Sequence, residues 1–167
     1  LTIEIEHVNI EALAQLEKEG VKVFPQPSVI KVVQDKGLQK QFYKEHNIPS
    51  SEFFLIAGCD EVALFESEFP LMQKMRKGGY DGKGVTPMRS REDLPNAFNE
   101  PSVLEKMVDF EKELSVIVSR NKKGEIKSYP CVECVFNPEA NLVDVLFSPA
   151  NITKEQENIS QSIAKDI

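Results

Sequence analysis

The sequence predicts an α+β fold with an antiparallel sheet. Alternating strand patterns dominate residues 70–148, and most of them are separated by short turn sequences. Helical patterns precede and follow this region. Strands that are joined by hairpins pair antiparallel, and such segregation of helices from strands is typical of α+β proteins. With 167 residues, the chain can bury one well-formed core or two small lobes that share one.

Before the strand-rich region, helices and strands are both expected. The expected elements are a strand at 1–8, a helix at 10–18, a strand at 21–24, a helix from 28 towards 43, and a strand at 53–56. The two helices follow from apolar residues at helical spacing. Asp60 is a suitable N-cap for a short helix that ends at Glu66.

A glycine-rich loop divides the next two strands. Strands are expected at 71–74 and 86–88, which makes the segment between them the tip of a hairpin. Ser90 and Asp93 then have the spacing of a capping box, which predicts the start of another helix.

Strand patterns continue almost to the end of the chain. The expected elements are strands at 103–107, 113–120, 126–136 and 142–148, a turn at 121–124, and an amphipathic helix from 153 onward. Because the chain opens on a strand pattern and ends in a helical one without a C-cap glycine, we expect it to be a piece of a longer protein.

The charge distribution disfavours polymeric or membrane partners. The net charge of −7 opposes general affinity for nucleic acid or anionic membranes. No apolar run approaches the roughly 20 residues that span a bilayer. A local basic patch is formed by Lys74, Arg76, Lys77 and Lys83. A basic patch on an acidic chain favours the capture of a small anion.

The three cysteines favour a reducing, cytoplasmic location rather than a disulfide scaffold. Cys131 and Cys134 are spaced as C-x-x-C, but the surrounding residues have a strand pattern. A strand would direct the two thiols to opposite faces, and no second Cys or His pair lies nearby. A zinc or redox site is therefore disfavoured.

The loop KMRKGGYDGKGV, residues 74–85, contains four glycines and four cations. It does not fit a Walker A motif, because Gly84 follows Lys83, nor a Rossmann motif, because Pro87 occupies the third glycine position. Glycines nevertheless let backbone N–H groups approach an oxyanion, and lysines add charge. A glycine loop between two strands can cover a nucleoside triphosphate; the alternative is a solvated hairpin tip.

An apolar strand that runs into an acidic connector follows at residues 103–116. Such a connector can bind adenosine, since backbone groups read the adenine edge and a carboxylate accepts the ribose hydroxyls. Glu113 is best placed for the ribose, and Glu105 could orient a cation or the adenine amine. The alternative for either residue is an ordinary surface charge.

Taken in order, six segments resemble the ATP-grasp superfamily and, within it, the N5-carboxyaminoimidazole ribonucleotide synthetases of purine biosynthesis. They are TIEIEHV, QDKGLQKQFY, NIP, QKMRKGGYDGKGV, VLEKMVDFEKELSVIVSRN and YPCVECVFNPEANLVD. The resemblance covers essentially the whole chain. Its most specific parts are K-x-x-GGYDGKG and E-K-x-V-x-F-x-x-E.

The resemblance implies an ATP-grasp fold fragment: the lid lobe plus part of the C-terminal antiparallel-sheet lobe. Residues 1–27 would end a Rossmann-like N-terminal lobe, 28–102 would form the lid lobe, and 103–167 would begin the C-terminal lobe. The implied reaction uses MgATP and bicarbonate to form carboxyphosphate, whose carboxyl group passes to the amine of 5-aminoimidazole ribonucleotide. A homodimer is also implied for the full-length protein.

Site residues follow from the same resemblance. Those implied for ATP are Lys36 and Lys74 at the phosphates, Gly78, Gly79, Gly82 and Gly84 in the loop, Glu105, Lys106 and Val108 at the adenine, and Glu113 at the ribose. Those implied for bicarbonate and the ribonucleotide are Tyr80, Asp81 and Lys83. Either Glu4 or Glu6 would lie near the ribonucleotide, with Glu6 favoured.

The magnesium-binding acidic pair of these enzymes, and their N-E-x-x-P-R-x-H-N-S-G motif, have no match in this chain. We therefore expect no metal ligands in it, and we expect the isolated chain to be catalytically inactive. Three alternatives remain: another ATP-grasp ligase or carboxylase, such as a glycinamide ribonucleotide transformylase or a biotin carboxylase; a nucleotide-binding module without catalysis; and an interaction domain that binds no ATP.

Overall fold

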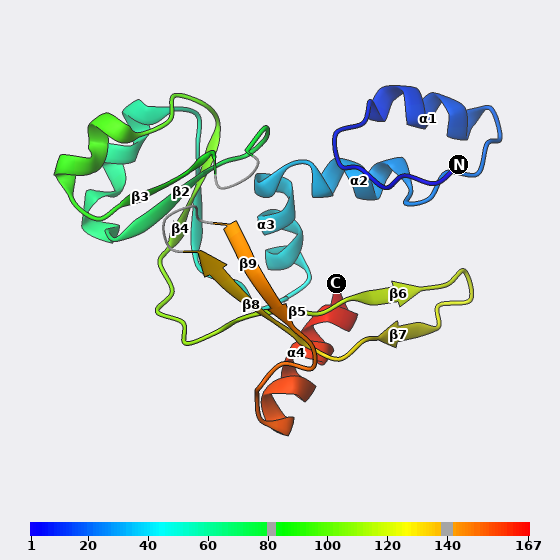
Figure 1. The fold of residues 1–167 in the computed structure, drawn as a ribbon. Coiled ribbons are helices and arrows are strands. Elements are labelled where there is room, and N and C mark those ends of the chain that lie inside the picture. Colours follow the sequence, from blue (N-terminus) through cyan, green and yellow to red (C-terminus); the bar gives the residue numbers. More distant parts are fainter. Residues whose placement is uncertain (80–82, 138–141) are drawn as a thin grey trace. The chain divides into compact units, whose positions relative to one another are not determined.

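The chain contains two compact units, each with its own antiparallel sheet (Figure 1). The computed structural model describes residues 1–79, 83–137 and 142–167. The first unit consists of Leu1–His46 and Ser50–Met107, and the second of Asn47–Pro49 and Val108–Ile167. Helices accompany antiparallel sheets in the chain, so the α+β prediction is confirmed.

The sheet of the first unit has four strands in the order β1-β4-β2-β3, and every pair is antiparallel. The strands are β1 (Phe53–Ile56), β2 (Leu71–Met75), β3 (Val85–Met88) and β4 (Ser102–Lys106). The predicted hairpin is confirmed, because β2 pairs directly with β3 and Lys74 lies opposite Val85. We call residues 76–84, which join these two strands, the glycine loop.

The two faces of this sheet have different roles. Leu71, Met88 and Leu104 lie fully buried on one face, where they form a core with Val62. Two 3₁₀ helices contribute to this core: η1 (Cys59–Glu68) and η2 (Arg91–Asn96). Because successive residues of a strand point to opposite faces, polar residues that alternate with this apolar set emerge on the other face.

The helices before the sheet differ from the prediction at one point. α1 (Ile10–Lys18) matches the prediction, but the helix expected from 28 towards 43 is two helices, α2 (Pro27–Val33) and α3 (Lys36–Glu45). The break occurs because Asp35 has an extended backbone, with φ −132° and ψ 106°. Its carboxylate accepts hydrogen bonds from N–H groups in the first turn of α3, so it is the N-cap of that helix.

Three smaller predictions also needed correction or qualification. The strands expected at 1–8 and 21–24 are reduced to one isolated parallel bridge between Thr2 and Phe24. Gly58, not Asp60, occupies the N-cap position of η1. The capping box of Ser90 and Asp93 is confirmed, although the helix that it opens is a 3₁₀ helix.

The second unit contains a three-stranded sheet in the order β5-β8-β9, a separate hairpin of β6 and β7, and a C-terminal helix. These elements are β5 (Glu113–Ser115), β6 (Val118–Arg120), β7 (Ile126–Ser128), β8 (Val132–Asn137), β9 (Leu142–Phe147) and α4 (Lys154–Asp166). The strands expected at 113–120 and 126–136 are therefore each divided in two. Pro130 separates β7 from β8, since proline cannot donate a ladder hydrogen bond.

β9 exposes a row of apolar side chains at one edge of this sheet. The exposed residues are Leu142, Val143, Val145, Leu146 and Phe147. Across the described ranges of the chain, no helix has the length and apolar character needed to span a membrane.

Candidate nucleotide-binding site

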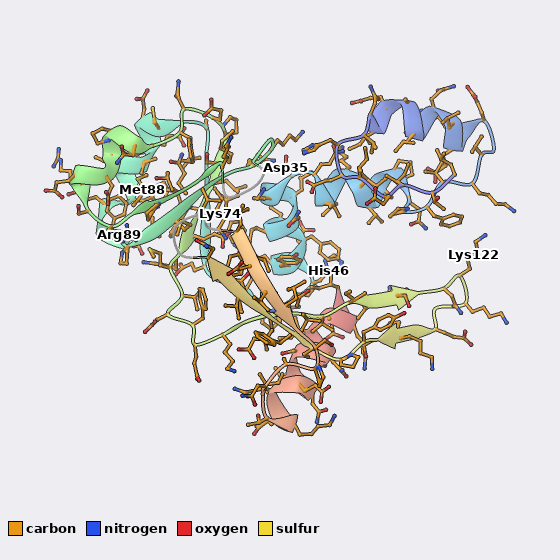
Figure 2. All side chains as sticks on the ribbon, in the orientation of Figure 1. Asp35, His46, Lys74, Met88, Arg89 and Lys122 are labelled. Atoms are coloured by element: carbon orange, nitrogen blue, oxygen red, sulfur yellow. The ribbon has the colours of Figure 1, made fainter. Side chains whose placement is uncertain are left out.

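A buried carboxylate shared by two lysines lies on the sheet face opposite the core of the first unit. Lys74 lies opposite Val103, and Glu105 lies opposite Met72, so both charged residues emerge on the same face. Nζ of Lys74 is 3.1 Å from Oε2 of Glu105; Lys74 is labelled in Figure 2. Glu105 is only 8% exposed, and a charge buried to this extent requires a partner.

The second lysine is Lys40 of α3, whose Nζ lies 3.2 Å from the same Oε2 atom. It also donates to Oγ of Ser50 at 2.6 Å and to Oγ of Ser51 at 3.0 Å. Ser51 in turn donates to Glu105 at 3.1 Å. Sequence reasoning missed this residue as part of the site. Its spacing of four residues from Lys36 could have indicated it, because residues i and i+4 share one helix face.

Electrostatics keep this carboxylate ionised. Desolvation by burial is the largest influence on the pKa of Glu105 and raises it, but the charges and hydrogen bonds of Lys74 and Lys40 together lower the pKa below its ordinary value. The cluster thus contains two ammonium groups and one carboxylate. This excess of one positive charge suits it to binding an anion.

The two ends of the glycine loop pack tightly against each other, and we call the residues in contact there, Met75, Gly79, Lys83 and Gly84, the neck of the loop. The N–H of Met75 donates to the carbonyl oxygen of Gly84 at 2.8 Å. Gly84 has φ +83°, and a Cβ added there would lie 2.9 Å from Cα of Gly79. A Cβ on Gly79 would itself lie 2.8 Å from the carbonyl oxygen of Lys83. Neither position has space for a side chain, and Gly84 also has a backbone conformation that favours glycine.

Of the remaining loop residues predicted for the site, Tyr80, Asp81 and Gly82 lie outside the described residues. Gly78 has φ +80° with open space around it, and Lys83 is exposed.

Arg76 differs from what the basic patch predicted. Its guanidinium is paired with Asp35, with 2.8 Å between Nε and Oδ1, so it is not available as an unpaired cation for an anionic ligand. Lys36 begins α3, and its N–H donates to the carbonyl oxygen of Arg76 at 3.0 Å. The start of α3 is therefore attached to the base of the glycine loop.

Glu6 is exposed, and it lines a cavity together with two residues of the glycine loop. A cavity of about 350 Å³ is lined by Glu6, His7, Val8, Gln34, Lys77 and Gly78. Glu4 is exposed and is not among the described residues that line this cavity. The lining combines one carboxylate with one ammonium group, a suitable setting for a polar ligand.

The residues predicted for adenosine are divided between the two units. In the first, Lys106 ends β4, and its Nζ pairs with Oε2 of Glu68 at 2.6 Å. In the second, Val108 is 60% exposed in the segment before β5, and Glu113 is the first, exposed residue of that strand. Within the described part of the chain, no group of three or more His, Cys, Asp or Glu side chains could hold a metal ion.

Comparison with known proteins identifies the family. Residues 41–167 match the ATP-grasp domain family. The chain belongs to this family. ATP-grasp membership accounts for the strand, glycine loop and strand arrangement, and it confirms the fold expected from the sequence.

Three proteins that are similar to this chain have related enzyme names. The phosphoribosylaminoimidazole carboxylase of Ogataea methanolica is 34% identical to this chain over an aligned length of 173 residues. The alignment covers 98% of this chain and 31% of the relative. The carboxyaminoimidazole ribonucleotide synthase of Aspergillus clavatus, crystallised with ATP, is 32% identical with a TM-score of 0.91, and the match covers 99% of this chain and 44% of that one.

A second structure from Aspergillus clavatus, the N5-carboxyaminoimidazole synthase in complex with ADP and 5-aminoimidazole ribonucleotide, is 28% identical with a TM-score of 0.86. That match covers 99% of this chain and 44% of the other. The chain thus spans less than half the length of each of these three relatives.

Proposed function

We propose that this chain is the central part of an N5-carboxyaminoimidazole ribonucleotide synthetase. The proposed reaction consumes ATP and bicarbonate and carboxylates the amine of 5-aminoimidazole ribonucleotide, with carboxyphosphate as the intermediate. The observation that carries the proposal is the pairing of Lys74 with buried Glu105 beside the neck of the glycine loop. The proposal is also supported by sequence identities of 34% and 28%, over 98% and 99% of this chain, to two relatives with related enzyme names.

The proposed nucleotide contacts follow from this geometry. Lys74 and Lys36 would bind the phosphates of ATP, because both lie at the base of the glycine loop. Lys74 belongs to β2, and the N–H of Lys36 donates to the carbonyl oxygen of Arg76. Glu105 would accept from the adenine amine, with Lys106 and Val108 beside it. Glu113 would accept from the ribose hydroxyls. The loop glycines Gly78, Gly79, Gly82 and Gly84 would let backbone N–H groups approach the phosphates.

The proposed carboxylation site involves the middle of the glycine loop. Tyr80, Asp81 and Lys83 would face bicarbonate and the ribonucleotide. Glu6 is the favoured acidic residue there, because it lines the cavity that also contains Lys77 and Gly78. Carboxyphosphate is short-lived in water, so exclusion of solvent by this loop would protect it. Phosphoryl transfer itself depends mainly on positioning and on neutralisation of charge.

Magnesium is proposed for the whole enzyme, with its ligands outside this chain. Within the described residues, no cluster of three or more His, Cys, Asp or Glu side chains could hold the ion. The division into lobes at 1–27, 28–102 and 103–167 stays a prediction, as do a homodimer and a cytoplasmic location. The acidic net charge supports small-molecule partners rather than nucleic acid.

Phosphate release by the full-length protein tests the proposal. The expected result is release that requires ATP, bicarbonate and 5-aminoimidazole ribonucleotide together. Release with glycinamide ribonucleotide and formate, or with biotin, in place of 5-aminoimidazole ribonucleotide would instead assign the protein to another ATP-grasp activity. Tight ATP binding without release would indicate a regulatory nucleotide-binding module, and absence of ATP binding would indicate an interaction domain.

A further inference from the structure

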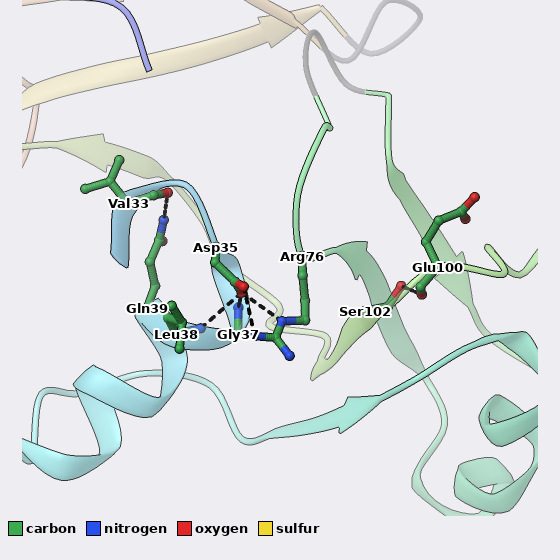
Figure 3. Close-up of polar contacts among 8 residues, drawn as sticks. All are labelled: Val33, Asp35, Gly37, Leu38, Gln39, Arg76, Glu100 and Ser102. Atoms are coloured by element: carbon green, nitrogen blue, oxygen red, sulfur yellow. Dashed lines mark hydrogen bonds and ion pairs between the residues drawn. The ribbon is translucent and has the colours of Figure 1, made fainter. Parts of the chain in front are cut away.

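A bidentate ion pair joins the start of α3 to the base of the glycine loop. Nε and Nη2 of Arg76 donate to Oδ1 and Oδ2 of Asp35, each at 2.8 Å (Figure 3). Asp35 is 4% exposed. Two parallel hydrogen bonds fix both the distance and the orientation of a guanidinium, which a single contact cannot do.

The backbone of Arg76 also forms two hydrogen bonds. Its N–H donates to the carbonyl oxygen of Pro101 at 2.9 Å, and its carbonyl oxygen accepts from the N–H of Lys36 at 3.0 Å. Arg76 is the first residue after β2 and lies two residues beyond Lys74. The point where the loop leaves the sheet is therefore fixed to two neighbouring segments.

Gly37 provides an independent sign of this close fit. A Cβ added at Gly37 would lie 2.5 Å from Nε of Arg76, so the guanidinium occupies the space that any side chain would need. The N–H of Gly37 also donates to Oδ1 of Asp35 at 2.9 Å. One carboxylate thus caps α3 and holds the arginine that packs against the first turn of the same helix.

We propose that Asp35 and Arg76 form a positioning pair that keeps Lys36 and Lys74 at a fixed separation for binding of nucleotide phosphates. Lys36 follows Asp35 directly. Lys74 lies in β2, two residues before Arg76. Neither member of the pair needs to contact the nucleotide. The inference rests on the proposed function only in taking ATP as the ligand.

Four variants of the full-length protein test this pair. Asp35→Asn keeps a side-chain oxygen that can cap α3 but removes the charge, and Arg76→Met keeps the length of the side chain without its donors. The double variant completes a cycle. Arg91→Met is the matched control, because Arg91 forms an exposed pair with Glu66 in the same unit, at 3.7 Å.

ATP affinity, measured by calorimetry on protein shown to be folded, is the main readout. We expect each single variant to weaken ATP binding about 10-fold, which is slightly less than the loss of one direct charged hydrogen bond to the phosphates. We expect the double variant to bind no more weakly than the worse single variant, and Arg91→Met to match the wild type. Arg76→Lys should restore part of the affinity, because it keeps the charge but not the bidentate geometry.

Two results would overturn the pair. One is ATP affinity within about twofold of the wild type in folded Asp35→Asn and Arg76→Met. The other is additive losses in the double variant, which would mean that the two residues act separately. Wild-type protein that binds ATP but shows no ribonucleotide-dependent phosphate release would remove the proposed function and leave the pair standing. Wild-type protein without ATP binding would remove both.

Discussion

Oε2 of Glu105 lies between Nζ of Lys74, at 3.1 Å, and Nζ of Lys40, at 3.2 Å. The two lysines come from different elements, a strand and a helix, and both contact this carboxylate. The arrangement follows from the antiparallel register of β2 and β4, which directs Lys74 and Glu105 to one face. The carboxylate therefore holds Nζ of Lys74, the group that we propose binds a nucleotide phosphate.

Substitution of Lys74 tests its proposed contact with phosphate. Lys74→Met should weaken ATP binding by about 2 kcal/mol, because it removes a charge-assisted hydrogen bond. Lys44→Met is the control, as Lys44 is an exposed residue of α3. The dissociation constant for ATP should rise in the first variant and stay unchanged in the second. Equal affinity in both variants would exclude Lys74 from the phosphate site.

Lys40 should matter for stability, since its side chain is buried and fully engaged. Lys40→Met leaves Ser50 and Ser51 without their donor and leaves Glu105 with one ammonium partner. We expect a loss of about 2 kcal/mol in the free energy of unfolding, measured by urea denaturation. A double variant, Lys40→Met with Glu105→Gln, should lose less than the sum of the two single variants, since each single variant already removes the Lys40–Glu105 ion pair.

The pH dependence of stability should also report on Glu105. Burial raises its pKa, but the two lysines outweigh burial and lower the pKa below the ordinary value of 4.5. The carboxylate therefore stabilises the fold above that value, and its contribution is lost as pH falls through the lowered pKa of the folded state. Urea midpoints of wild type and Glu105→Gln should differ most near neutral pH and converge as pH falls below 4.5 through the lowered pKa. A constant difference would contradict this assignment.

The neck of the glycine loop should not accept even the smallest side chain. Gly84→Ala places a residue with a Cβ in a left-handed backbone conformation, which costs about 1 kcal/mol. It also adds a contact of 2.9 Å with Cα of Gly79, and the displacement of that backbone costs about 2 kcal/mol. Gly20→Ala is a matched control, because Gly20 has φ +90° with nothing within 4 Å. Urea denaturation should show a loss in Gly84→Ala that clearly exceeds the loss in Gly20→Ala. Equal losses would mean that the neck relaxes freely.

The isolated chain should release no phosphate from ATP, with or without bicarbonate and the ribonucleotide. The physical reason is charge: a bound metal ion neutralises a triphosphate, and the described residues contain no cluster of three or more His, Cys, Asp or Glu side chains that could hold one. A coupled phosphate assay on the purified 167-residue chain measures this. Turnover above the background of Lys74→Met would refute it.

Local patterns were sufficient to predict much of the first unit. The strands beside the glycine loop have alternating side chains and a clear turn between them, and α1 has a helical period that ends at a glycine; both elements formed as predicted. Asp35 shows where local patterns fail. Its carboxylate caps α3 and also pairs with Arg76, 41 residues away, and apolar periodicity carries no information about such a partner.

The same limit applies to the candidate site. Glu105 could be identified from its strand, but the lysine of α3 that neutralises it could not, since only the tertiary fold brings Lys40 to β4. In the second unit, β5 and β6 pair with different partners, so one strand pattern produced two short strands. Long-range pairing, rather than propensity, determined each of these outcomes.

The exposed row along β9 has a practical consequence for handling the protein. β9 pairs with β8 on one side, and among the described residues no strand pairs with its outer edge, so this apolar strand can accept another strand by backbone hydrogen bonding. Preparations of the 167-residue chain should therefore self-associate as they are concentrated. Replacing Val145 with lysine, which blunts such edges, should yield material better suited to calorimetry and crystallisation.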